Sequence, residues 1–134
     1  MIFIDANVPM YLIGGTHPHK LDAQSILERL VGEGRRLVTS AEVFQEMLHR
    51  YVSIDRRGMI EPAFETLAGL ADDVFAVEQA DVVAAKGLLH SHPGLSARDA
   101  LHCAVMRRRE IRQVLSFDRG FDQLAGIARM PVAD

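Results

Sequence analysis

The chain has 134 residues, 49% of them hydrophobic and 25% charged, with a formal net charge of −3 at pH 7. This length predicts one domain, residues 1–134, that buries about two-thirds of its unfolded surface without cross-links. No stretch approaches the roughly 18 apolar residues of a membrane span, and an acid at position 5 argues against a signal peptide. A single cysteine, Cys103, excludes an internal disulfide, so a reducing, cytoplasmic location is expected.

The first stretch, residues 1–8, is an apolar run that ends in an acid and an amide. Ile2, Phe3 and Ile4 form a continuous apolar run, which is typical of a strand buried on both faces of a parallel sheet. Asp5 then falls at the carboxyl end of this strand, where ligands bind in open α/β sheets. Asp5 is also a good N-cap for a helix beginning near Pro9, so its position alone leaves both roles open.

Helices and strands alternate along the rest of the chain. Apolar spacing and glycine breaks predict helices over 9–13, 20–31, 43–52, 59–71, 80–89, 97–109 and 121–124. Further strands are predicted at 37–38, 74–77, 113–115 and 127–130. Gly58 separates the third and fourth helices, which indicates a helical hairpin. This alternation predicts an α/β fold, with a parallel sheet and helices on both of its faces.

Two groups of residues invite a binding interpretation that the sequence supports only weakly. His17 and His19 share a predicted loop, but no third metal ligand lies nearby in the sequence. Arginines cluster at positions 56–57 and at positions 107–109 with Arg112. Arginine binds phosphate well, but cations also favour helix C-termini, so each cluster by itself indicates a solvated helix end.

Four acids from four separate segments are expected to meet at one edge of the sheet. Asp5 and Asp118 each follow a predicted buried strand. Asp99 begins the helix that leads into strand 113–115, and helix starts lie near that edge in a right-handed α/β array. Glu46 borders the apolar stripe of the helix after the second strand. Converging carboxylates repel one another and are stable mainly when a cation neutralises them.

Carboxylate oxygens without cysteine or histidine partners suit Mg²⁺ or Mn²⁺. Such a site can generate hydroxide and stabilise the charge that builds on phosphate during in-line displacement. The chemistry that this predicts is metal-dependent cleavage of a phosphodiester.

Each acid also has a structural explanation. The segments 96–99 and 39–42 both match a capping box, which gives Glu42 a structural role and leaves Glu46 as the site candidate. For Asp99, capping and catalysis are equally supported. Asp118 matches an N-cap of the helix near Phe121.

The four acidic segments resemble those of a known family, the PIN-domain ribonucleases, and especially the toxins of VapBC-type toxin–antitoxin pairs. The matching stretches are Phe3-Ile-Asp-Ala-Asn7, Val43-Phe-Gln-Glu46, Ser96-Ala-Arg-Asp-Ala-Leu-His102 and Leu115-Ser-Phe-Asp-Arg-Gly-Phe-Asp122. They occur in the family's order and span the whole chain, and jointly they are fairly specific.

The resemblance implies a three-layer α/β/α PIN fold with a parallel sheet of order 3-2-1-4-5. It implies a Mg²⁺ or Mn²⁺ site that serves both metal binding and catalysis, built from Asp5, Glu46, Asp99 and Asp118. Supporting positions are then Asn7, Ser116 and Asp122. Glu42 lies one helical turn from Glu46, so the second acid could be either residue.

The family resemblance also implies partners: an RNA substrate, a small antitoxin and a second copy of the chain. The alternative function is a PIN-like module that binds RNA or protein without cleaving. Phosphoaspartate phosphatases are disfavoured because Asn7 replaces their second acid and the only late lysine, Lys86, lies inside a predicted helix. Response-regulator receivers are disfavoured because no lysine follows Lys86.

Overall fold

The structure, a computed structural model, describes residues 1–130 and contains a five-stranded parallel sheet of order β3-β2-β1-β4-β5. The strands are β1 (Ile2–Ile4), β2 (Leu37–Ser40), β3 (Asp73–Phe75), β4 (Gln113–Leu115) and β5 (Ala128–Met130). The helices are α1 (Asn7–Ile13), α2 (Pro18–Gly32), α3 (Ala41–Ser53), α4 (Ile60–Leu70), α5 (Gln79–Ser91) and α6 (Ala97–Arg108), and the short 3₁₀ turns are η1 (Arg57–Met59) and η2 (Arg119–Gln123). The predicted fold class and strand order are confirmed.

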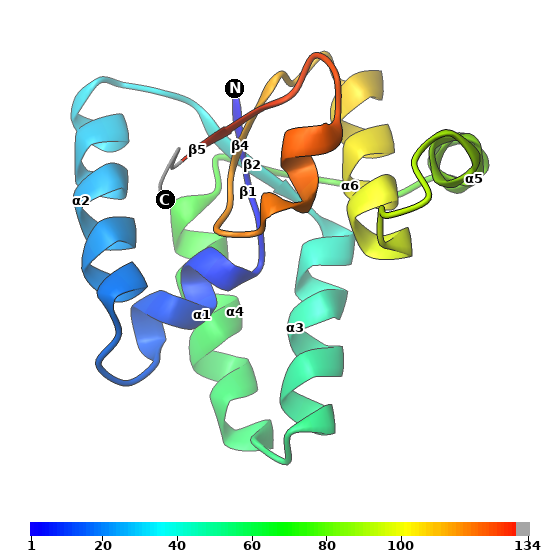
Figure 1. Ribbon diagram of the computed structural model, residues 1–134. Coiled ribbons are helices and arrows are strands. Elements are labelled where there is room, and N and C mark those ends of the chain that lie inside the picture. Colours follow the sequence, from blue (N-terminus) through cyan, green and yellow to red (C-terminus); the bar gives the residue numbers. More distant parts are fainter. Residues whose placement is uncertain (131–134) are drawn as a thin grey trace.

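Helices cover both sides of the sheet, and α3 and α4 form the predicted hairpin beyond its carboxyl edge (Figure 1). The central strand β1 pairs in parallel with β2 on one side and β4 on the other. Its residues Ile2, Phe3 and Ile4 are fully buried, as their apolar run predicts. Within the described residues, no helix is long and apolar enough to cross a bilayer.

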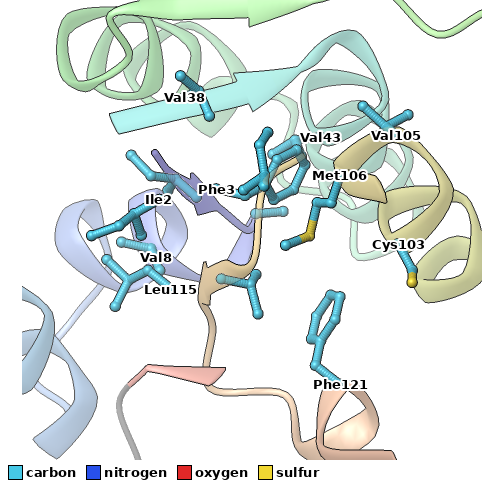
Figure 2. Packing of buried hydrophobic residues seen from close by; sticks show 14 of the residues in the cluster. Ile2, Phe3, Val8, Val38, Val43, Cys103, Val105, Met106, Leu115 and Phe121 are labelled. Carbon is cyan, nitrogen blue, oxygen red and sulfur yellow. The ribbon is translucent and has the colours of Figure 1, made fainter. Parts of the chain in front are cut away.

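Helix α6 is the most deeply buried helix and packs beside the central strand. Cys103, Val105 and Met106 are buried in the same core as Phe3, and Met106 points from α6 toward the strands (Figure 2). Cys103 is therefore a core residue, and burial raises the pKa of its thiol. This packing holds α6 against the carboxyl end of β1.

Several predicted boundaries shift by a few residues. Helix α2 begins at Pro18 within the segment predicted as a loop, with proline in the first turn and His17 as N-cap. The last predicted helix is the 3₁₀ turn η2, and the third strand ends at Phe75.

The predicted capping box over residues 39–42 is wrong. Thr39 belongs to β2, and its hydroxyl donates to the carbonyl of Ile4 at 3.0 Å. Ser40 is the N-cap residue of α3 and its side chain makes no capping hydrogen bond. The reason is that the strand runs two residues longer than predicted, which directs Thr39 toward β1 and away from the helix.

Candidate metal and active site

The carboxyl end of β1 presents Asp5, whose carboxylate is buried and held by three donors. The backbone N–H of Ala6 donates to Oδ1 at 2.8 Å, and the Ser116 hydroxyl donates to Oδ2 at 2.6 Å. The Asn7 amide donates to the same Oδ2 at 3.4 Å. Ser116 follows β4, so the pairing of two adjacent strands orients this acid.

Ser116 and Asn7 connect Asp5 to the loop that carries Asp118. The Asn7 amide also donates to Ser116 Oγ at 3.2 Å, and the backbone N–H of Asp118 donates to the same oxygen at 3.0 Å. Asn7 Oδ1 accepts from the backbone N–H of Phe117 at 3.3 Å. Two of the three predicted supporting residues, Asn7 and Ser116, therefore lie where they hold Asp5 and the Asp118 loop in place.

Helices α3 and α6 bring Glu46 and His102 to Asp5. Nε2 of His102 lies 2.9 Å from Oε1 of Glu46 and 3.8 Å from Oδ1 of Asp5. Each of the three residues offers a ligand atom within 4.8 Å of the others. Glu46, one turn beyond Glu42, is the α3 acid in this group.

His102 ends the stretch Ser96–His102, and no role was predicted for it. Its spacing from Asp99, three residues along one helix, is a signal that both face the same side. Burial opposes protonation of His102, but the hydrogen bond to Glu46 and the nearby carboxylates raise its pKa above the ordinary value. The imidazole can therefore supply positive charge to the surrounding acids.

Asp99 lies in the first turn of α6, where Ser96 is the cap and the Asp99 side chain faces the other acids. Its backbone N–H donates to Oγ of Ser96 at 3.1 Å, so Ser96 caps helix α6. Its side chain, only 6% exposed, hydrogen-bonds Asp118 instead of completing a capping box. Burial and the charges of Asp118 and Asp5 raise the pKa of Asp99 to about 7.

Asp118 caps η2 and faces Asp99. Its Oδ1 accepts from the backbone N–H of Gly120 at 2.8 Å. Gly120 is close enough to both acids that a Cβ atom there would lie 2.6 Å from Oδ2 of Asp99 and 3.2 Å from Oδ1 of Asp118. A residue without a side chain at this position lets the two carboxyl groups approach.

Asp122, the remaining predicted supporting residue, is linked to the acidic group through Arg129. Its Oδ1 accepts from Nε of Arg129 at 2.8 Å, and Nη1 of Arg129 lies 3.3 Å from the Ser116 carbonyl. The same arginine lowers the pKa of Asp122. Asp122 therefore contacts the site through Arg129 and the backbone of Ser116.

The structure brings the four predicted acids to one place from four elements or their ends. Burial raises the pKa of Asp5, the imidazole of His102 opposes this shift, and Glu46 adds to it. Burial is the largest cause of the raised pKa of both Asp5 and Asp99, and the neighbouring carboxylates add to it, so negative charge is crowded in a partly buried site. A hard divalent cation would relieve this crowding, and the oxygen donors with one histidine fit Mg²⁺ or Mn²⁺.

The loop histidines do not join this group. His17 stacks on Tyr11 with ring centroids 4.7 Å apart, and His19 stacks on Phe117 at 4.2 Å. Their rings thus pack α1 and the start of α2 against the loop after β4.

The chain is similar to known proteins over almost its whole length. The PIN domain family profile matches residues 2–127. The chain is 54% identical to ribonuclease VapC13 of Mycobacterium tuberculosis over 130 residues, which are 97% of this chain and 99% of the relative.

Two solved structures have the same fold. VapC20 of Mycobacterium tuberculosis, described as a sarcin-ricin loop cleaving toxin, superposes with a TM-score of 0.73 at 25% identity, over 96% of this chain and 97% of that one. VapBC2 of Rickettsia felis, bound to a fragment of promoter DNA, contains a chain with a TM-score of 0.73 at 12% identity, over 96% and 97% of the two chains.

Proposed function

Because this chain belongs to the PIN domain family, we propose that it is a metal-dependent endoribonuclease and the toxin of a toxin–antitoxin pair. The observation that carries the proposal is the convergence of Asp5, Glu46, Asp99 and Asp118 on one acidic site, where Asp5 and Asp99 are buried, Glu46 is half-buried and Asp118 is exposed. The 54% identity to a ribonuclease over almost the whole chain supports the reaction class.

We assign the cation to Asp5, Glu46, Asp99 and Asp118, with His102 beside them. When bound, Mg²⁺ or Mn²⁺ supplies a water of lowered pKa and stabilises charge on the reacting phosphodiester. The donors around Asp5, from Ala6 and Ser116, hold its two oxygens in fixed directions.

The protonation of Asp99 couples metal binding to pH. Because its pKa is about 7 without metal, the carboxyl group carries a proton over much of the neutral range. A carboxylate must be deprotonated to bind a cation, so binding releases this proton. In its deprotonated form Asp99 would offer its carboxylate to the cation beside Asp118.

The remaining residues have positioning roles in this proposal. Asn7 and Ser116 link Asp5 to the Asp118 loop, and Asp122 supports the carbonyl of Ser116 through Arg129.

The proposal includes a protein partner and a location. The resemblance to VapBC toxins implies a small antitoxin that silences the enzyme, and a homodimer. A cytoplasmic location fits an RNA substrate and a single, buried, unpaired cysteine at position 103.

An Asp5→Asn variant separates the nuclease from a module that only binds RNA. The amide loses the charge that holds the cation, so cleavage of structured RNA in Mn²⁺ should fall by orders of magnitude while RNA binding remains. Asp22→Asn, on exposed α2, removes the same charge away from the site and should retain activity.

Expression of the wild type should slow growth, whereas expression of Asp5→Asn should not. Equal cleavage of RNA by the wild type and by Asp5→Asn would show that Asp5 does not hold the catalytic cation. No cleavage by the wild type in Mn²⁺, together with intact RNA binding, would support the binding module.

A further inference from the structure

A cavity of about 430 Å³ opens beside the carboxylates and is lined by one of them, Glu46, and by the supporting residue Asn7. Asn7 and Glu46 line it at the acidic end, and α3, η1 and α1 form its walls. Its far wall carries cationic and aromatic side chains. The cavity is therefore continuous with the proposed cleavage site but has the opposite charge.

Three arginines line this cavity: Arg50, Arg56 and Arg98. Nη1 of Arg98 lies 3.6 Å from Oε2 of Glu46, which places one positive charge at the boundary with the acids. Among residues 1–130, neither Arg50 nor Arg56 forms an ion pair with a carboxylate. Their charges are thus available to an anion from solution.

Helix-end preference explains only part of this arrangement. Arg50 lies in the last turn of α3, where a cation is favoured by the helix dipole. Arg56 lies beyond the helix end and close enough to Tyr51 that its charge lowers the phenol pKa, although burial raises that pKa more. Neither the helix dipole nor the contact with Tyr51 requires that Arg50 and Arg56 line the same cavity.

The remaining wall suits a nucleobase. Tyr11 and Tyr51 line the cavity together with the apolar side chains of Met10, Ile54 and Met59. Aromatic and apolar surfaces bind bases by stacking, and arginine binds the adjoining phosphate. The volume lies at the lower end of the range for small-ligand pockets, which fits one unpaired nucleotide better than a duplex.

We propose that this cavity binds the nucleotide next to the scissile phosphate in single-stranded RNA. Arg50 and Arg56 contact its phosphate, and the Tyr11 side of the cavity holds its base. This inference rests on the proposed ribonuclease function, because it is the scissile phosphate at the four acids that brings the neighbouring nucleotide to the cavity. It narrows the substrate to RNA that is unpaired at this position.

The test is RNA binding by the full-length chain in EDTA, where cleavage does not occur. The probe is a fluorescent 12-nucleotide single-stranded RNA of mixed sequence, followed by anisotropy over a range of salt concentrations. The double variant Arg50→Ala with Arg56→Ala should weaken binding on the order of tenfold. The slope of log K against log salt should fall by roughly 0.7, since the two arginines contact the same phosphate and each phosphate contact on a single strand contributes about 0.7.

A matched control removes the same charge elsewhere. Arg29 lies in the last turn of α2, as Arg50 does in α3, and Arg57 adjoins Arg56 without lining the cavity. Arg29→Ala with Arg57→Ala should change affinity and salt slope much less. Lysine at positions 50 and 56 should restore the salt slope, which guards against a loss of folding in the alanine variant.

Equal weakening by the two double variants would overturn the cavity assignment and leave only general charge attraction. If the affinity for a 12-base-pair RNA duplex fell as much in the Arg50 and Arg56 variant as the affinity for the single strand, the preference for unpaired RNA would be overturned. Wild type that binds RNA through these arginines but never cleaves it in Mn²⁺ would contradict the nuclease proposal alone. Wild type that cleaves RNA, with no special effect of the Arg50 and Arg56 changes, would contradict the cavity alone.

Discussion

Nε2 of His102 lies 2.9 Å from Oε1 of Glu46, although 56 residues separate them in the chain. The imidazole is fully buried and faces Asp5 as well. In the metal-free protein it is therefore the cation nearest to two of the proposed metal ligands. This contact makes the stability of the site depend on the protonation of one residue.

His102→Gln should destabilise the metal-free protein more at pH 6 than at pH 9. The pKa of His102 is raised in the folded state, so its stabilising charge is fully present below the unfolded value of about 6.5. That contribution is lost as pH rises through the folded value. Loss of a charged, buried hydrogen bond costs roughly 1.5–3 kcal/mol. Urea unfolding in EDTA measures the free energy of unfolding at both pH values. An equal decrease at pH 6 and pH 9 would show that His102 stabilises the protein by packing and not by its charge.

Divalent cations should raise the melting temperature of the wild type. A ligand that binds only the folded state at 100 times its Kd stabilises by about 2.7 kcal/mol, which corresponds to a shift of several degrees. Millimolar Mn²⁺ or Mg²⁺ should therefore exceed NaCl of matched ionic strength in thermal unfolding. Asp118→Asn should reduce the shift. A cation effect no larger than that of NaCl would contradict a shared carboxylate site.

Asp99→Asn should stabilise the metal-free protein at pH 8 and abolish cleavage. The pKa of Asp99 is raised from 3.8 to about 7 on folding, so the folded state loses stability as pH rises across this interval. One pKa unit corresponds to about 1.4 kcal/mol, so removal of the charge should gain at most a few kcal/mol. The Ser96 cap survives because it uses the backbone N–H of Asp99.

Melting curves in EDTA at pH 5 and pH 8, with cleavage rates in Mn²⁺, test this prediction. The stabilisation should be small at pH 5, where the wild-type carboxyl group is already protonated. A variant that is less stable at pH 8 but still active would make Asp99 only a helix cap.

Gly120→Ala should lower activity more than stability. The added Cβ would lie 2.6 Å from Oδ2 of Asp99, so this carboxyl group must move away from Asp118. Because φ of Gly120 is not in the left-handed region, the backbone accepts alanine. The free energy of unfolding should therefore change by about 1 kcal/mol or less. We expect the cleavage rate in Mn²⁺ to fall at least tenfold.

Gly94→Ala provides the matched control for this change. Its added Cβ would meet only Oε1 of Gln123, at 3.8 Å, and should leave the rate unchanged. Full activity of Gly120→Ala would show that the site tolerates displacement of the Asp99 carboxyl group.

Local patterns in the sequence were sufficient to predict the order of helices and strands and the presence of a parallel sheet. The apolar run Ile2–Ile4 followed by Asp5 predicted a buried central strand with an acid at its end, and β1 has this structure. Helical spacing located α3 and α6, and so the helices that carry Glu46 and Asp99. These features depend on residues two to four positions apart, which the sequence shows directly.

The contacts within the site were not predictable in this way. The Ser116 hydroxyl reaches Asp5 across 111 residues, Thr39 bonds the neighbouring strand instead of its helix, and Asp122 pairs with Arg129. Each depends on which side-chain atoms meet when separate elements pack.

The sequence by itself therefore determined which elements form, in what order, and which acids lie at their ends. Only the tertiary structure decided that His102 lies between Asp5 and Glu46, that the Asp99 carboxyl group faces Asp118, and that a cavity with three arginines opens beside them. The physical reason is that backbone propensity and hydrophobic periodicity act over one or two turns. Side-chain hydrogen bonds and charge pairs act over a few ångströms between segments, and packing sets those distances.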